Sequence, residues 1–263
     1  MTRHPWPLAA ALLLTSTLAA QAAPGRVLPL HLDGGLAWVD ARIDGRDARL
    51  LIDSGGAASL ALRADWGPAA TGAAASATTS QDAQGRQRVN AVLQVGDVML
   101  AGQALVPAPA AQTWAKARRP AGVDGYLGWG WLREQRWVVD YPARQLHLLG
   151  ADEPMPAGCG DAPLPFELLG SLPVVRLHGA AGELLTLGLD TGASRNVIRP
   201  ALAGAASAGP LRAGERPIAA GGFATVALQA PGLDGFLGQD FFSRHRVCVD
   251  PGRRQLWVQP LAE

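Results

Sequence analysis

Short apolar runs that alternate with polar residues dominate the chain and predict a mainly β protein. Several runs form pairs around turn signals such as Asp44-Gly45 and Pro251-Gly252, a pattern typical of β-hairpins. The predicted pairs are residues 36–43 with 48–52, 137–139 with 145–149, 173–178 with 183–189, and 247–249 with 255–258. Helices are expected to be short, at residues 59–66 and as single turns after Gly128 and Gly238.

The chain also contains an internal repeat. Residues 123–148 align without a gap to residues 233–258, and 10 of the 26 positions are identical, whereas unrelated sequences should agree at about two. A second matching pair lies upstream, at residues 48–63 and 185–200. Each half therefore has an apolar strand that ends in Asp-Ser/Thr-Gly and, later, Asp-Gly-aromatic-Leu-Gly followed by two strands. This pattern predicts two related β-rich lobes.

Composition and charge limit the function classes. Residues 151–165 are rich in Asp, Pro and Gly and predict a linker between an N-terminal lobe, 23–150, and a C-terminal lobe, 166–263. Hydrophobic residues make up 48% of the chain and charged residues 17%, which excludes a disordered protein. The formal net charge of +1 gives no overall attraction to nucleic acid or to an anionic membrane. A partner must therefore be recognised locally.

The first 22 residues have the features of a secretory signal peptide. Arg3 precedes an apolar run that ends in Ala20-Gln21-Ala22, and this run is shorter than the roughly 20 residues that a membrane span requires. We expect a cleaved leader, no stable membrane anchor and a secreted or periplasmic product. Export would let Cys159 and Cys248 form a disulfide, but the sequence leaves a bridge and two free thiols equally open.

Asp53 and Asp190 each stand at the end of an apolar strand, where a carboxylate that is buried alone is costly. If the lobes pack with pseudo-twofold symmetry, the two side chains face each other, and two close carboxylates then share a proton because both cannot readily ionise. Such a pair supplies one base and one acid at the same pH. The base can activate a water that attacks a peptide carbonyl, and the acid can donate to the leaving amine.

The residues that follow each Asp suit this chemistry. Gly55 and Gly192 allow a tight turn and a close approach of backbone amides to the carboxylates. The hydroxyls of Ser54 and Thr191 can bridge from one loop to the other lobe. A single Asp-Ser/Thr-Gly occurs by chance in about one chain in ten of this length, usually as a turn, but two copies within matching repeats are harder to dismiss.

Other chemistries lack a motif. The histidines, His4, His31, His147, His178 and His245, have no zinc-binding spacing, and there is no nucleophile elbow or nucleotide-binding glycine loop. We therefore expect no metal and no cofactor. Residues that we expect to be structural are the tryptophans Trp129, Trp131 and Trp137 and the matched pairs Arg136 with Arg246 and Asp140 with Asp250.

The loops 53–55 and 190–194, each followed by Asp-Gly-Tyr/Phe-Leu-Gly, resemble those of aspartic proteases of the retropepsin/pepsin clan. Residues 234–258 are especially similar to bacterial retropepsin-like proteins, here with two tandem copies in one exported chain. The resemblance implies an all-β, bilobal pepsin-like fold, in which two retropepsin-like β-barrel lobes enclose an active-site cleft. It implies Asp53 and Asp190 as the catalytic pair. The supporting residues would be Ser54, Gly55, Thr191, Gly192 and Ser194.

The resemblance also implies two features around the pair. An apolar-Gly pair crosses behind each Asp loop in a ψ-shaped structure, although turn geometry would also explain these glycines; the matching residues are Leu127, Gly128, Leu237 and Gly238. A β-hairpin flap covers the cleft, and residues 79–89 are its candidate, with Gln84, Gly85 and Arg86 contacting substrate. A plain surface loop explains this polar segment equally well.

Four features depart from the family pattern. Ala57 stands where Ser194 stands in the second loop, and the flap candidate contains no tyrosine. From Asp53 to Gly125 is 72 residues, but from Asp190 to Gly235 is 45, so we expect the second lobe to lack a full flap. The chain after the leader is also shorter than a typical pepsin, which puts the extent of the cleft in doubt.

The leading hypothesis is an exported, monomeric aspartic endopeptidase acting on peptide or protein substrates, because one chain supplies both loops. One rival is a catalytically silent peptide-binding protein that retains the fold. The other is a structural protein of the cell envelope whose repeat only builds a β-scaffold. In that case the carboxylates of Asp53 and Asp190 should lie far apart and solvated.

Overall fold

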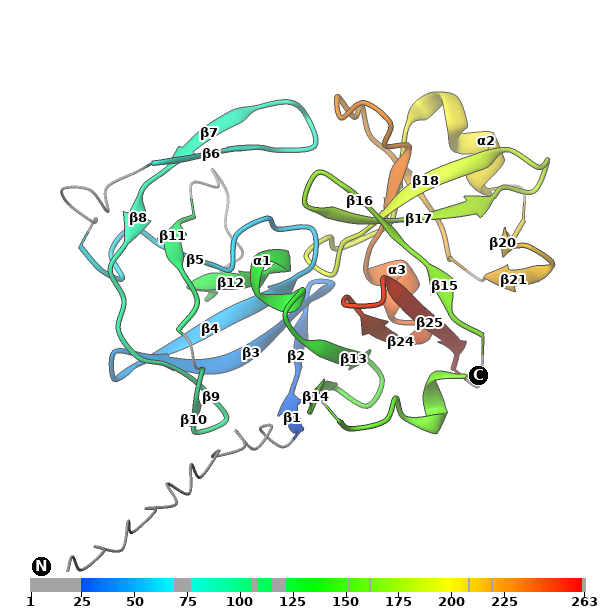
Figure 1. Ribbon diagram of the computed structural model, residues 1–263. Coiled ribbons are helices and arrows are strands. Elements are labelled where there is room, and N and C mark those ends of the chain that lie inside the picture. Colours follow the sequence, from blue (N-terminus) through cyan, green and yellow to red (C-terminus); the bar gives the residue numbers. More distant parts are fainter. Residues whose placement is uncertain are drawn as a thin grey trace, which may run out of the picture.

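The structure is a computed structural model that describes residues 25–68, 77–105, 108–114, 122–150, 152–160, 162–207, 209–218 and 220–261. The predicted leader, residues 1–22, lies outside the described residues. Strands predominate and form two lobes that lie side by side, left and right in Figure 1. The prediction of a mainly β, two-lobed fold is therefore confirmed.

A nine-stranded sheet forms the first lobe, in the order β10-β9-β3-β4-β12-β5-β11-β8 with β2 paired to β3. The predicted hairpin is β3 with β4, and β12 runs parallel to β4 but antiparallel to β5. The strands are β2 (His31–Asp33), β3 (Leu36–Ile43), β4 (Arg46–Asp53), β5 (Leu60–Leu62), β8 (Val92–Leu93), β9 (Val98–Leu100), β10 (Gln103–Ala104), β11 (Ala111–Thr113) and β12 (Gly125–Gly128). A separate hairpin pairs β6 (Thr78–Gln81) with β7 (Gln87–Asn90).

The second lobe repeats this arrangement in an eight-stranded sheet, β21-β20-β17-β18-β23-β19-β22, with β16 paired to β17. Its central strand β23 runs parallel to β18 and antiparallel to β19, as β12 does between β4 and β5. The strands are β16 (Glu167–Leu169), β17 (Leu172–His178), β18 (Leu184–Leu189), β19 (Val197–Ile198), β20 (Leu211–Ala213), β21 (Arg216–Ile218), β22 (Ala224–Thr225) and β23 (Gly235–Leu237). The short helices η3 (Pro200–Leu202) and α2 (Ala203–Ser207) follow β19.

A six-stranded sheet, β1-β14-β13-β24-β25-β15, joins the lobes. Its centre is the antiparallel pair β13 and β24, which are equivalent strands of the two repeats. Its strands are β1 (Arg26–Pro29), β13 (Arg136–Asp140), β14 (Gln145–Leu149), β15 (Leu164–Pro165), β24 (His245–Asp250) and β25 (Gln255–Pro260). Because both repeats contribute to one sheet, this sheet holds the two lobes together.

Ion pairs and a disulfide reinforce the shared sheet. Arg246 of the second repeat lies 2.6 Å from the carboxylate of Asp140, and Arg136 of the first lies 3.4 Å from that of Asp250. Both carboxylates are buried, so the prediction of structural pairs is confirmed. Cys159, in the 3₁₀ helix η2 (Ala157–Cys159), is bonded to Cys248 of β24. This bridge ties the segment between the lobes to the sheet.

The helix predicted for residues 59–66 is wrong. These residues form strand β5 and a turn, because Leu60, Ala61 and Leu62 are all buried between neighbouring strands. A short run that is apolar at every position fits a strand covered on both faces as well as a helix. The single helical turns after Gly128 and Gly238 are confirmed as α1 (Trp129–Leu132) and α3 (Gln239–Phe242). Trp129, Trp131 and Trp137 are buried, as predicted.

His245 makes the stability of the second lobe sensitive to acid. Its ring is fully buried, donates from Nδ1 to the carbonyl of Phe241 at 2.9 Å and stacks on the Phe241 ring. Burial lowers the pKa of His245, the charge of Arg244 acts in the same direction, and the Phe241 carbonyl opposes both. Below about pH 6.5, His245 therefore binds a proton in the unfolded chain more readily than in the folded chain.

We expect the free energy of unfolding to fall as the pH drops below about 6.5, and to fall less in His245→Gln over the same window. Urea titrations of both proteins at a series of pH values measure the difference. Parallel curves for the two proteins would contradict this role of His245.

Candidate active site

Each candidate catalytic carboxylate stands where a buried strand ends. Asp53 is the last residue of β4, and Asp190 follows β18 directly. The chain then turns sharply, with the Gly56 N–H donating to the Asp53 carbonyl at 3.0 Å and the Ala193 N–H donating to the Asp190 carbonyl at 3.1 Å. Both Asp side chains line the cleft between the lobes.

The two Asp loops interlock through their hydroxyl residues. The Ser54 N–H donates to Thr191 Oγ1 at 2.9 Å, and the Thr191 N–H donates to Ser54 Oγ at 3.0 Å. The hydroxyls continue across the lobes, because Ser54 Oγ donates to the Leu189 carbonyl at 2.8 Å and Thr191 Oγ1 to the Ile52 carbonyl at 2.7 Å. Ser54 and Thr191 are both fully or almost fully buried. These reciprocal bonds fix one loop against the other.

Gly55 and Gly192 bring each loop against the opposite carboxylate. A Cβ on Gly55 would lie 2.5 Å from Asp190 Cγ, and a Cβ on Gly192 would lie 2.5 Å from Asp53 Cγ. Any side chain would therefore collide at either position. The Gly192 N–H also donates to Asp190 Oδ1 at 2.9 Å. The structure thus places Asp53 and Asp190 together in one cleft.

The Leu-Gly pairs lie beside the Asp loops: Leu127 and Gly128 end β12, Leu237 ends β23, and Gly238 follows as the N-cap of α3. Gly128 is paired in register with Asp53, and the Asp190 N–H donates to the Leu237 carbonyl at 3.0 Å. A Cβ on Gly128 would lie 2.5 Å from the Gly56 carbonyl oxygen, and one on Gly238 would lie 2.7 Å from the Ala193 carbonyl oxygen. Leu127 and Leu237 are buried. Residues 125–128 and 235–238 therefore pack closely against the Asp loops, while the ψ-shaped arrangement that the family resemblance implies stays a prediction.

Two buried tyrosines lie near the carboxylates. Burial raises the pKa of Tyr126, and the negative charge of Asp53 raises it further, while the Ala58 N–H acts in the opposite direction. Burial also raises the pKa of Tyr141, followed by the charges of Asp190 and Asp53. The Tyr141 hydroxyl donates to the Thr191 carbonyl at 3.4 Å. Both phenols therefore stay protonated where carboxylates titrate.

Asn196 was not predicted from the sequence. It is fully buried, its Oδ1 accepts the Gly238 N–H at 2.8 Å, and its Nδ2 donates to the Ala220 carbonyl at 2.6 Å. Its own N–H donates to Asp240 Oδ2 at 2.8 Å. Asn196 therefore holds the strand behind the second Asp loop. The signal that could have identified it is a polar residue at the same distance after the Asp in each repeat, since Ser59 holds that place in the first.

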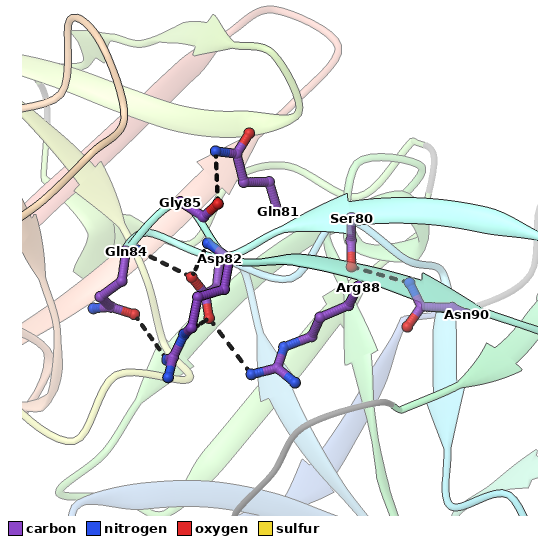
Figure 2. Close-up of polar contacts among 8 residues, drawn as sticks. Ser80, Gln81, Asp82, Gln84, Gly85, Arg88 and Asn90 are labelled. Atoms are coloured by element: carbon purple, nitrogen blue, oxygen red, sulfur yellow. Dashed lines mark hydrogen bonds and ion pairs between the residues drawn. The ribbon is translucent and has the colours of Figure 1, made fainter.

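Residues 79–89 lie in a hairpin formed by β6 and β7, and Asp82 organises its tip (Figure 2). Asp82 Oδ1 accepts the N–H groups of Gln84 at 3.1 Å and Arg86 at 2.9 Å, and Oδ2 accepts Arg86 Nε at 2.8 Å. Burial raises the pKa of Asp82, but these bonds outweigh it and hold the pKa below its usual range. Gly85 adopts a φ of +80°, which favours glycine at this turn.

The hairpin tip reaches the second lobe. The Gln229 N–H donates to the Ala83 carbonyl at 2.9 Å, and Ala83 packs against a cluster that contains Leu233 and Phe236. A Cβ on Gly85 would lie 2.5 Å from Gln229 Oε1. The hairpin therefore spans the cleft and contacts both lobes. In the described part of the second lobe, the hairpin of β20 and β21 pairs with β17 and does not line the cleft.

The cleft has a volume of about 690 Å³, and six of the fourteen site residues that the sequence suggested line it. Asp53, Gly55, Asp190, Gly192, Gln84 and Arg86 line it. Ala57 lines it as well, whereas Ser194 is exposed and its carbonyl oxygen faces Gly35 in the turn between β2 and β3. The cleft also includes residues that were not predicted, among them Arg88, Asn90, Trp114, Leu172 and Phe236.

Within the described ranges, no cluster of His, Cys, Asp or Glu could hold a metal ion. Nor does any helix formed by the described residues have the length and apolar character needed to cross a bilayer.

Among the comparisons with known proteins, only the one with solved structures bears on the fold. Neither the protein-family models nor the curated protein sequences give a match. Among solved structures, the aspartic proteinase from Irpex lacteus matches with a TM-score of 0.61 at 14% sequence identity. The match covers 90% of this chain and 98% of the proteinase. The chain therefore has the bilobal fold of pepsin-like aspartic proteinases.

Proposed function

We propose that the chain is an aspartic endopeptidase that hydrolyses peptide bonds with a water activated between Asp53 and Asp190. The observation that carries the proposal is the interlocked pair of loops, which sets each carboxylate against the glycine of the opposite loop within one cleft. This close packing does not fit a β-scaffold with distant, solvated carboxylates. The pepsin-like fold gives independent support.

The proposed mechanism uses only the two carboxylates and water. One carboxylate is ionised and accepts a proton from the water, which attacks the peptide carbonyl. The other carboxyl group is protonated and donates its proton toward the substrate. As the C–N bond breaks, the first group passes the proton that it took from water to the leaving amine, and the second takes a proton back from the tetrahedral intermediate, so the pair again shares one proton. The β6–β7 hairpin covers the cleft, where it would hold an extended peptide and limit the access of bulk water.

The proposal includes an exported monomer of the bacterial tandem retropepsin-like type. One chain supplies both Asp loops, so a second copy is not needed to complete the cleft. The disulfide between Cys159 and Cys248 favours an oxidising compartment, in agreement with a leader at residues 1–22. The substrate class is peptide or protein, with no metal or other cofactor.

A second candidate function is peptide binding without turnover. Its support is the Gly56-Ala57 sequence of the first loop, in which Ala57 stands where the second loop has Ser194, and the shorter second lobe. Retention of both Asp residues and of the interlocked hydroxyls favours the endopeptidase.

Incubation of residues 23–263 with a peptide library from about pH 3 to pH 8 tests the proposal. We expect cleavage, faster on the acidic side, that a statine-type mimic of the tetrahedral intermediate blocks and a chelator leaves unchanged. Binding of the mimic without cleavage of any peptide would favour the silent binding protein. Cleavage that resists the mimic would contradict the endopeptidase proposal.

Gly85→Ala is expected to lower kcat/KM for peptide cleavage about tenfold, because a side chain at φ +80° is strained and collides with Gln229, which weakens closure of the hairpin. Gly102→Ala is the matched control: Gly102 has a φ of +75° but nothing within 4 Å of an added Cβ. It should share the strain and leave kcat/KM unchanged. Equal kcat/KM for Gly85→Ala and the wild type would show that hairpin closure does not limit the reaction.

A further inference from the structure

The two walls of the cleft differ in chemistry. The wall from the second lobe is apolar and consists of Leu169, Leu172, Ala230, Pro231, Leu233 and Phe236. The wall from the first lobe combines polar and aromatic side chains, and its members are Ser80, Arg88, Asn90, Gln112, Thr113, Trp114 and Tyr126. Successive side chains of an extended peptide point to opposite sides. The two residues joined by a bond lying over the Asp pair would therefore face different walls.

Arg88 places a positive charge on the first wall. Along β7, Gln87 and Val89 are exposed on the outer surface, whereas Arg88 and Asn90 are more buried and line the cleft. The Arg88 side chain is only 25% exposed. Figure 2 shows it on the same side of the hairpin as Asp82. A strand fixes the direction of its side chains, so Arg88 is held toward the cleft.

Within the described hairpin, two guanidinium groups, those of Arg86 and Arg88, share the carboxylate of Asp82. Arg86 bonds to Asp82 at 2.8 Å, and two backbone N–H groups complete the shell of that carboxylate. Arg88 forms a second, longer ion pair with the same carboxylate, with Nη2 3.6 Å from Asp82 Oδ2. A guanidinium has five N–H donors and matches a carboxylate in a bidentate geometry, so it can keep contacts within the protein and still bind an anionic side chain.

We infer that the cleft selects peptides in which an acidic side chain, Glu or Asp, lies under Arg88 and an apolar side chain lies against Phe236 on the other side of the cleaved bond. This inference rests on the proposed function and names its substrate class. Trp114 and Tyr126, whose rings meet edge to face, form the floor on which the stem of the acidic side chain packs. Leu172 and Leu233 complete the apolar pocket.

Matched peptides that differ only by Glu, Gln or Lys at the position facing Arg88 test the inference. The position is located first by library cleavage, or by selecting bound peptides from the library with Asp190→Asn if the wild type cleaves nothing. Values of kcat/KM are measured near pH 6, where Glu is ionised. We expect the wild type to prefer Glu over Gln by about tenfold or more, as for a hydrogen bond to a charged group. Arg88→Met should abolish this preference, and Arg88→Glu should reverse it toward Lys.

Arg86→Met is the matched control, because it removes the same charge from the same hairpin at a side chain that is 64% exposed. It should change kcat/KM for the Glu and Gln peptides by the same factor. If Arg86→Met reduces the preference as much as Arg88→Met does, only the general charge of the hairpin matters, and the inference is overturned. Equal kcat/KM for Glu and Gln peptides in the wild type overturns it as well.

Binding measurements separate this inference from the proposed function. Affinities of the same peptides for wild type and Arg88→Met are measured by calorimetry in an Asp190→Asn background, which prevents turnover. Tighter binding of the Glu peptide that depends on Arg88 supports the inference even if the wild type cleaves nothing, in which case the endopeptidase proposal alone fails. Cleavage without preference overturns the inference alone. Absence of both binding and cleavage overturns both.

Discussion

Asp53→Asn and Asp190→Asn are each expected to lower kcat for peptide hydrolysis by at least about 10³-fold, with a much smaller change in KM. A carboxamide has nearly the same shape as a carboxylate, but it neither accepts a proton from water nor shares one with its neighbour. The amide oxygen can still accept the Gly192 N–H that now bonds Asp190 at 2.9 Å. The loops should therefore stay in place while the proton transfer is lost.

Asp234→Asn is the matched control for this experiment. Asp234 belongs to the Asp-Gly-Phe-Leu-Gly segment of the same lobe, but its carboxylate accepts the Thr186 N–H at 2.8 Å and does not line the cleft. It should lower stability and keep kcat near the wild-type value. The measurements are steady-state kinetics and urea unfolding of all four proteins. A carboxamide variant of Asp53 or Asp190 that keeps a tenth of the wild-type kcat would rule out the proposed mechanism.

The strands and the repeat could be predicted because their signals are local. Alternating burial along β3 leaves a pattern of period two, and the turn residues between paired strands mark their ends. The failure at β5 has the same origin. All three of its residues are buried, and a run without alternation does not distinguish a strand covered on both faces from a helix.

Among the contacts that assemble the site, only those between equivalent residues of the two repeats could be predicted from the sequence. Matching Asp loops suggested that Ser54 and Thr191 reach across the lobes, because equivalent residues related by a pseudo-twofold axis meet near that axis. The pairing of β13 with β24 and the bond between Cys159 and Cys248 depend on how the lobes are placed in space. The two walls of the cleft come from segments far apart in the chain. For this reason, nothing in the sequence indicated that Arg88 and Phe236 line the same cleft.

Thr191→Val is expected to lower the free energy of unfolding by about 2 to 6 kcal/mol, because it leaves two buried backbone groups without partners at about 1 to 3 kcal/mol each. Valine keeps the size and branching of threonine but has no hydroxyl. The Ser54 N–H would lose its acceptor, and the Ile52 carbonyl would lose its donor. The remaining bond, from the Thr191 N–H to Ser54 Oγ, joins the loops at one point only. The alignment of the carboxylates should suffer, so kcat should fall as well.

Thr191→Ser separates the hydroxyl from the rest of the side chain. Serine restores both hydrogen bonds and removes one buried methyl group, so its cost should be about 1 kcal/mol and its kcat should stay near that of the wild type. Thr186→Val makes the same chemical change on the partly exposed face of β18 and should alter stability by less than about 0.5 kcal/mol. Urea unfolding of Thr191→Val at the wild-type midpoint would mean that the hydroxyl does not lock the lobes. Loss of stability in Thr191→Val, with recovery in Thr191→Ser to within about 1 kcal/mol of the wild type, would assign to one oxygen atom both the joining of the lobes and the alignment of the two carboxylates.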